Sequence, residues 1–173
     1  MKKSMLVLLV LILVALVSAG KVAELPKVLK PQRIAIDGDK LIISQRQEYS
    51  VHVYSLSDYR LLATFGKKGE GPGEVKRPPY VFPLKDSILL YNWGKLIWFS
   101  KTGKLIKEKR LENELLLTVR PLVSNYLACR DFFDPRDFSH TLKFYLLDND
   151  AKNPRELYSG QRDANSADAK GFR

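Results

Sequence analysis

The sequence predicts an all-β protein, and two observations carry this prediction. After the first 19 residues, the chain consists of short apolar runs rich in β-branched and aromatic side chains, separated by turn signals. No stretch of this part repeats apolar residues at the helical period of 3.6 over three turns. An apolar content of 45% with 28% charged residues is typical of a globular chain and excludes a wholly disordered one.

Residues 1–19 have the composition of a secretory signal peptide. Lys2 and Lys3 give a positive start, and the 13 residues from Met5 to Val17 are all apolar. An uncleaved membrane anchor is the alternative, but a helix of this length spans about 20 Å, less than the ~30 Å hydrocarbon core. We therefore expect cleavage after Ala19, a secreted or periplasmic protein, and contact with the membrane only through this segment.

A polar lead-in over residues 20–32 precedes three predicted units of four strands each, at about 33–66, 80–110 and 117–158. The strands predicted in the first unit are 33–37, 40–44, 51–55 and 60–65. Those of the second unit are 80–84, 87–93, 96–100 and 105–109. Those of the third unit are 117–123, 126–130, 141–147 and 155–158. Residues 159–173 are interpreted as a polar tail.

The units restart the same pattern. Tyr54 of the first unit corresponds to Phe99 of the second, 45 residues later, and Phe99 corresponds to Leu146 of the third. A four-stranded unit that repeats every 40–50 residues is typical of β-propeller blades. A sandwich or barrel also contains many short strands, but it does not restart one four-strand pattern.

A glycine-rich segment joins the first two units. Its residues are Phe65, Gly66, Gly69, Gly71, Pro72, Gly73, Glu74 and Val75. A phosphate-binding loop would need a helix directly after the glycines, and the prolines Pro72, Pro78 and Pro79 disfavour one. A mobile linker is a further alternative, but glycines and proline between strands favour an ordered turn.

This segment resembles the blade connection of NHL-repeat and TolB-like six-bladed propellers, especially a secreted bacterial group with the phrase F-G-x-x-G-x-G-P-G-E-F-x-x-P. Val75 replaces the usual Phe and keeps an apolar side chain there. The resemblance covers about residues 31–158 and implies a ring of six blades, of which this chain holds about three. We expect either a piece of a longer protein or self-association of two copies into one ring.

The candidate binding loop comprises Asp131, Asp134, Asp137 and His140, on the connection between the second and third strands of the third unit. A calcium or catalytic role would need ligands from several blades, so a solvated hairpin is the favoured interpretation. His52, between two valines of a strand, is predicted to be structural, and Cys129 to be a buried thiol. The aromatic residues Tyr91, Trp93, Trp98 and Phe99 are assigned to packing between blades before any sugar-stacking role.

The sequence offers no cofactor or metal site. A single cysteine excludes a disulfide framework and a cysteine zinc site, and there are two histidines. The net charge of +10 is scattered through turns, and secretion argues against a nucleic acid partner. The favoured function is a binding module for a protein, peptide or glycan. The alternative is part of a propeller enzyme of the lactonase or lyase type, which related propellers imply.

Overall fold

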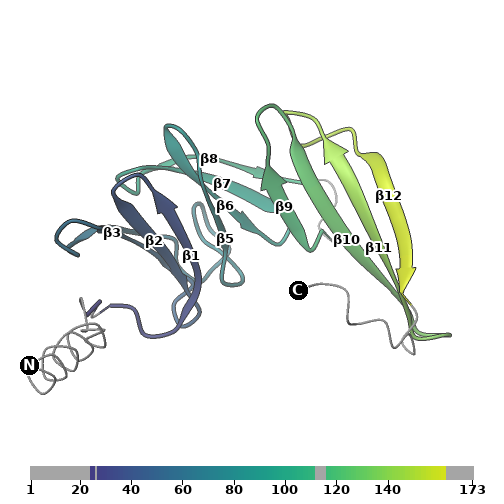
Figure 1. Ribbon diagram of the computed structural model, residues 1–173, viewed down its shortest axis with the longest axis horizontal. Coiled ribbons are helices and arrows are strands. Elements are labelled where there is room, and N and C mark those ends of the chain that lie inside the picture. Colours follow the sequence, from purple (N-terminus) through teal and green to yellow (C-terminus); the bar gives the residue numbers. More distant parts are fainter. Residues whose placement is uncertain (1–23, 26, 112–115, 163–173) are drawn as a thin grey trace, which may run out of the picture.

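The computed structural model describes residues 24–25, 27–111 and 116–162, and it confirms the all-β class (Figure 1). Within these residues there are twelve strands and no helix, in three four-stranded antiparallel sheets. The first sheet comprises β1 (Pro31–Asp37), β2 (Lys40–Gln45), β3 (Val51–Ser55) and β4 (Leu61–Phe65). The second comprises β5 (Tyr80–Pro83), β6 (Ser87–Asn92), β7 (Lys95–Ser100) and β8 (Leu105–Arg110). The third comprises β9 (Thr118–Pro121), β10 (Tyr126–Asp134), β11 (Ser139–Leu147) and β12 (Arg155–Arg162).

Each sheet is an up-and-down meander in which neighbouring strands in the sequence pair in space. The turns are short because glycine or another residue with positive φ reverses the chain. Gly38, with φ of 58°, joins β1 to β2, and Gly94, with φ of 73°, helps to join β6 to β7. These turns fix the register: Ile34 pairs with Ile43 across β1 and β2, for example.

The second sheet is buried on both faces because its side chains alternate between two hydrophobic clusters. Leu90 of β6 packs toward the first sheet, in a cluster with Val53 and Phe65. Its neighbour Leu89 packs toward the third sheet, in a cluster with Val119 and Leu147. The continuous apolar sequence of β6 and β7 follows from this double burial.

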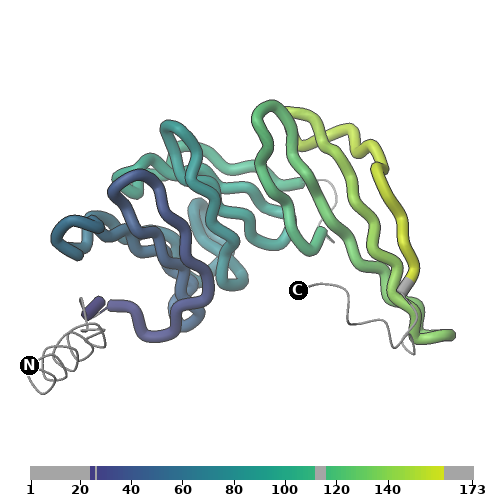
Figure 2. Tube along the Cα trace, in the orientation of Figure 1, coloured from purple at the N-terminus to yellow at the C-terminus, as the bar shows by residue number. Residues whose placement is uncertain are grey.

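The three sheets follow one another across the molecule in chain order (Figure 2). Their first strands are neighbours, because β5 contacts both β1 and β9. The first strands therefore bring three distant parts of the sequence to a common junction. This junction contains the candidate site.

The third sheet corrects three predicted boundaries. β10 continues to Asp134, β11 begins at Ser139, and their pairing runs unbroken from Tyr126 and Leu147 to the hairpin end. The predicted binding loop is thus mostly strand. β12 continues to Arg162, so the segment predicted as a polar tail begins in a strand. Polar side chains are tolerated there because β12 is an edge strand whose side chains are mostly exposed.

The predicted signal peptide and residues 163–173 lie outside the described residues. Within the described part of the chain, no helix is long and apolar enough to cross a membrane.

Candidate binding site at the junction of the sheets

The glycine-rich segment is an ordered clasp between the first two sheets. Gly69 N donates to Val75 O at 3.0 Å, and Val75 N donates to Lys67 O at 2.9 Å, so the segment folds back on itself. Val75 is 1% exposed and enters the hydrophobic cluster between the two sheets, as predicted for an apolar side chain at this position. Phe65 stacks on Phe99 of β7 with ring centres 4.6 Å apart.

Glu74 explains why glycine occupies position 69. Its carboxylate accepts a hydrogen bond from Gly71 N at 2.8 Å and pairs with Lys67 at 2.8 Å. A Cβ at residue 69 would lie 2.0 Å from Glu74 Oε2, so a side chain there would displace the carboxylate. The two hydrogen-bonding partners also lower the pKa of Glu74. The segment also binds the second sheet, because Gly73 N donates to Glu108 Oε2 at 2.9 Å.

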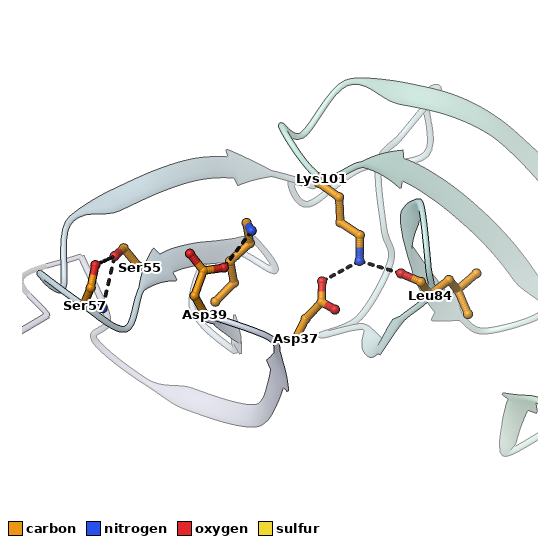
Figure 3. A network of polar contacts seen from close by, with 7 residues as sticks. Asp37, Asp39, Ser55, Ser57, Leu84 and Lys101 are labelled. Atoms are coloured by element: carbon orange, nitrogen blue, oxygen red, sulfur yellow. Dashed lines mark hydrogen bonds and ion pairs between the residues drawn. The ribbon is translucent and has the colours of Figure 1, made fainter.

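A second contact joins the first two sheets at the opposite end of β1 (Figure 3). Lys101, in the turn after β7, donates to the Asp37 carboxylate and to Leu84 O. The lysine thus bridges the end of β1 and the end of β5. Together with the clasp, it fixes the angle between the sheets and hence the shape of the junction.

A cavity of about 590 Å³ lies at this junction, between all three sheets. The residues that dominate its wall are Arg33 of β1, Arg77 and Tyr80 before and in β5, Trp93 after β6, and Arg130 and Phe132 of β10. They are guanidinium groups and aromatic rings, so the wall combines positive charge with flat apolar surface.

Each of these arginines lies over an aromatic ring. Arg33 Cζ is 3.4 Å from the centre of the Tyr80 ring, which ties the first sheet to the second. Arg77 Cζ is 3.3 Å from the centre of Trp93, and Arg130 Cζ is 4.0 Å from that of Phe132. Stacking holds a guanidinium flat while its N–H groups remain free at the edge.

The cavity is electropositive. Among the described residues, none of its three arginines forms an ion pair with a carboxylate. Arg33 Nε is buried and has no hydrogen-bond partner there. Asp131 also lines the cavity, but its two oxygens face His140 Nδ1, each at 3.1 Å.

Trp93 does not fit the prediction that the aromatic residues of this region pack between blades. Tyr91, Trp98 and Phe99 are buried and fit that interpretation, but 43% of the Trp93 surface is exposed. Its φ is 40°, a region that bulky side chains seldom adopt. It lies in the β6–β7 turn, because the strand pairing ends with Asn92 opposite Lys95. Sequence reasoning placed Trp93 in a strand and therefore missed it.

A second cavity of about 420 Å³ adjoins the first, and both are lined by Arg77, Asn92 and Trp93. Its other wall contains Lys95 and Arg110, and the glycine-rich clasp adds the carboxylates of Glu70 and Glu74. Asn92 holds the shared wall in place: its Oδ1 accepts from Lys76 N at 2.8 Å, and its Nδ2 donates to Arg77 O at 2.5 Å.

The four residues of the predicted binding loop do not converge on one point. Asp131 and His140 pair across β10 and β11. Asp134 binds Arg136 at 2.6 Å, and Asp137 Oδ1 accepts from Ser139 N at 2.9 Å, so both serve the hairpin turn. Of the four, Asp131 lines the junction cavity. In the part of the chain that the structure describes, no three His, Cys, Asp or Glu residues are grouped to hold a metal ion.

His52 and Cys129 lie in the positions that their predicted structural roles require. His52 is 2% exposed, with Nε2 2.8 Å from Gln45 Nε2 and Nδ1 3.0 Å from Thr64 Oγ1. Cys129 is a buried free thiol, and burial raises its pKa, so it stays protonated at neutral pH.

Neither a protein-family profile nor a curated protein matches the sequence. Among solved structures, 65 chains match the fold. One is a predicted exported protein from Bacteroides fragilis, with a TM-score of 0.57 and 18% sequence identity over 79% of this chain. This similarity concerns the fold alone. The chain spans 39% of the length of that protein.

Proposed function

We propose that the three sheets are blades of a β-propeller of the NHL-repeat and TolB-like kind. Three features support this arrangement: each sheet is a four-stranded meander, the first strands of the sheets are neighbours, and the second sheet is buried on both faces. First strands that meet in this way are those that line the central channel of a propeller. The glycine-rich clasp supplies the connection between blades.

We further propose that the protein is a binding module. The observation that carries this function is the junction cavity, whose wall contains three arginines that each stack on an aromatic ring. Arg33 comes from the first sheet, Arg77 from the connection between the first two sheets, and Arg130 from the third sheet. Cavities that place a few polar groups among aromatic rings are typical binding sites. The partner is a peptide, a protein segment or a glycan that enters this cavity.

Binding is tested by titrating the protein with a panel of acidic, basic and neutral peptides and oligosaccharides. Trp93 lies in the cavity wall, so a bound partner should change tryptophan fluorescence in a saturable way. The change should be lost in Arg33→Ala and kept in Arg60→Ala, whose side chain is 74% exposed in a turn of the first sheet. Failure of every panel member to bind would refute the function.

We also propose export across a membrane, because of the signal-like residues 1–19. Expression of the whole chain in a bacterial host, followed by fractionation and mass spectrometry, tests this. The expected product is a periplasmic or secreted protein that begins at Gly20. A protein that keeps Met1 and stays with the membrane would show that the segment is an anchor.

An enzyme of the lactonase or lyase type is the second candidate, and the Asp131–His140 pair favours it. A carboxylate that binds Nδ1 orients the imidazole so that Nε2 can exchange a proton with a substrate. Turnover of lactones or acidic oligosaccharides that His140→Gln abolishes, with binding unchanged, would support an enzyme. Binding without turnover would leave the binding module as the function.

A further inference from the structure

We propose that the junction cavity binds acidic oligosaccharides, chains of sugars that carry a ring carboxylate. This inference rests on the proposed function, because it names the partner class of the same cavity. Three observations lead to it: the charge of the wall, the exposed ring of Trp93, and the second cavity that adjoins the first.

The charge of the wall selects an anion. Arg33, Arg77 and Arg130 have no carboxylate partner among the described residues. A guanidinium held flat on a ring presents two parallel N–H groups, which match the two oxygens of a carboxylate. A ligand that carries a carboxylate would therefore supply the anionic partner that these arginines lack.

Trp93 selects a sugar. The β6–β7 turn reverses the chain with positive φ at residues 93 and 94, a geometry for which Asn-Gly is the preferred sequence. Tryptophan is strained there, and 43% of its surface stays exposed although Arg77 covers one face of the ring, which indicates that the open part of the ring serves another purpose. A sugar ring has an apolar C–H face that can cover the open part of the indole, and its ring carboxylate would then be directed to the guanidinium edge of Arg77.

An acidic peptide fits this wall less well. Its carboxylates are carried on flexible stems, so the ordering of each side chain opposes binding. It also presents no flat apolar face beside the carboxylate. A sugar acid satisfies Arg77 and Trp93 with one rigid ring, which makes it the favoured ligand.

The second cavity selects an oligomer. It continues beyond the wall of Arg77, Asn92 and Trp93, and it adds Lys95 and Arg110. Two carboxylates also line it, but each is paired with a lysine: Glu70 with Lys76 at 3.0 Å and Glu74 with Lys67 at 2.8 Å. Lys95 is paired with Glu108 at 2.8 Å, whereas Arg110 forms no ion pair among the described residues. A chain of several sugar acids can occupy both cavities with Trp93 between them.

Calorimetric titration of the intact protein tests this inference with three probes: a tetramer of galacturonic acid, a tetramer of galactose, and a hexapeptide of glutamate. We expect saturable binding of the galacturonate tetramer, with affinity at least about tenfold above that for the other two. Tighter binding of galactose or of the peptide would overturn the acidic sugar while leaving the binding module intact. If none of the three probes binds but another peptide or oligosaccharide of the panel binds in this cavity, the acidic sugar is likewise excluded and the binding module stands.

Two variants locate the site. Arg77→Lys keeps the charge but loses the flat fork, and we expect about a tenfold loss of galacturonate affinity. Trp93→Asn gives the preferred turn sequence, so it should lose binding without lowering the unfolding temperature. Arg60→Ala removes one positive charge from a residue that lines neither cavity, and it is the control. If all three variants bind galacturonate as tightly as the natural protein does, binding is a general effect of the protein's positive charge and the proposed site is wrong.

Discussion

His52 shows how neighbours determine the state of one side chain. Gln45 Nε2 can only donate, so His52 Nε2 accepts and Nδ1 carries the proton toward Thr64 Oγ1. Protonation of Nε2 would place two donors against each other. The ring is therefore neutral in the folded protein, and burial lowers its pKa below the 6.5 of an ordinary histidine.

This lowered pKa predicts an acid-sensitive fold. As the pH falls below about 6.5, the unfolded chain takes up a proton that folded His52 refuses, so the free energy of unfolding decreases. The contribution of His52 is complete above that pH and is lost on acidification until the folded pKa is reached. Urea unfolding at pH 7.5 and pH 5.5 should give a smaller difference for His52→Gln than for the natural protein. Equal pH dependence in His52→Gln and the natural protein would mean that other groups cause the acid sensitivity.

The backbone conformation at position 73 favours glycine. Its φ is 72°, and an added Cβ would lie 3.4 Å from Phe99 Cζ. Gly73→Ala should cost about 1–2 kcal/mol of unfolding free energy from backbone strain, because the added Cβ would make only an ordinary van der Waals contact with the ring. Gly38 has a similar φ of 58° with open space around it, so Gly38→Ala should cost about the same. Thermal unfolding of both variants measures the two losses, and a clearly larger loss in Gly73→Ala would show that the Phe99 ring crowds the added Cβ.

At the scale of the element, the strand order was predictable because every strand of the first two sheets carries apolar residues between clear turns. The predicted strand 51–55 matches β3, and 87–93 exceeds β6 by one residue. That residue is Trp93, whose aromatic side chain suggested a strand although it lies in the turn.

The third sheet was harder to predict because its strands continue into polar sequence. The segment after Arg130 contains charged residues and a proline, which indicated a loop, yet Phe133 and His140 pair across the extended hairpin. Their pairing is held by backbone hydrogen bonds and by ring contact at 5.0 Å between Phe133 and His140. Such support depends on the partner strand, and a single strand's pattern does not show it.

Asn92 holds the cavity wall in place, because it ties the end of β6 to the segment before β5. Its side chain binds the backbone on both sides of the Lys76–Arg77 peptide and is 5% exposed. Asn92→Ala leaves a partly buried donor and a partly buried acceptor without their side-chain partner, so it should cost about 1–2 kcal/mol. Urea unfolding measures the loss. Hydrogen exchange should show faster exchange of the Lys76 amide.

Asn92→Asp is the matched variant for this clamp. It keeps the acceptor for Lys76 N but loses the donor to Arg77 O. The Lys76 amide should therefore remain protected while stability falls. Rapid exchange of that amide in Asn92→Asp as well would show that the hydrogen bond to Asn92 does not protect it.

At the scale of the whole molecule, the cavity could not be predicted from sequence because its residues come from three sheets. Arg33, Arg77 and Arg130 are about one unit apart in the chain, and only the contacts of β5 with β1 and β9 bring them together. The predicted loop contributed Asp131 alone because the hairpin directs its other members elsewhere. The angle between sheets, set by the clasp and Lys101, decides which side chains meet.

The second sheet couples its two neighbours through adjacent residues. Leu89 and Leu90 are both 0% exposed and point to opposite faces of β6, toward the third and the first sheet respectively. Replacement of either with alanine should cost about 2–5 kcal/mol, because each leaves a cavity of similar size. Stability alone therefore cannot distinguish the two variants.

Hydrogen exchange can distinguish them if the sheets open one at a time, as stacked repeats do. Leu89→Ala should speed amide exchange in β9 and β10, and Leu90→Ala should speed it in β3 and β4. Each variant should leave the far sheet as protected as in the natural protein, after allowance for its lower global stability. Identical exchange patterns in the two variants would mean that the three sheets unfold as one unit, and the nearest-neighbour description of this molecule would be wrong.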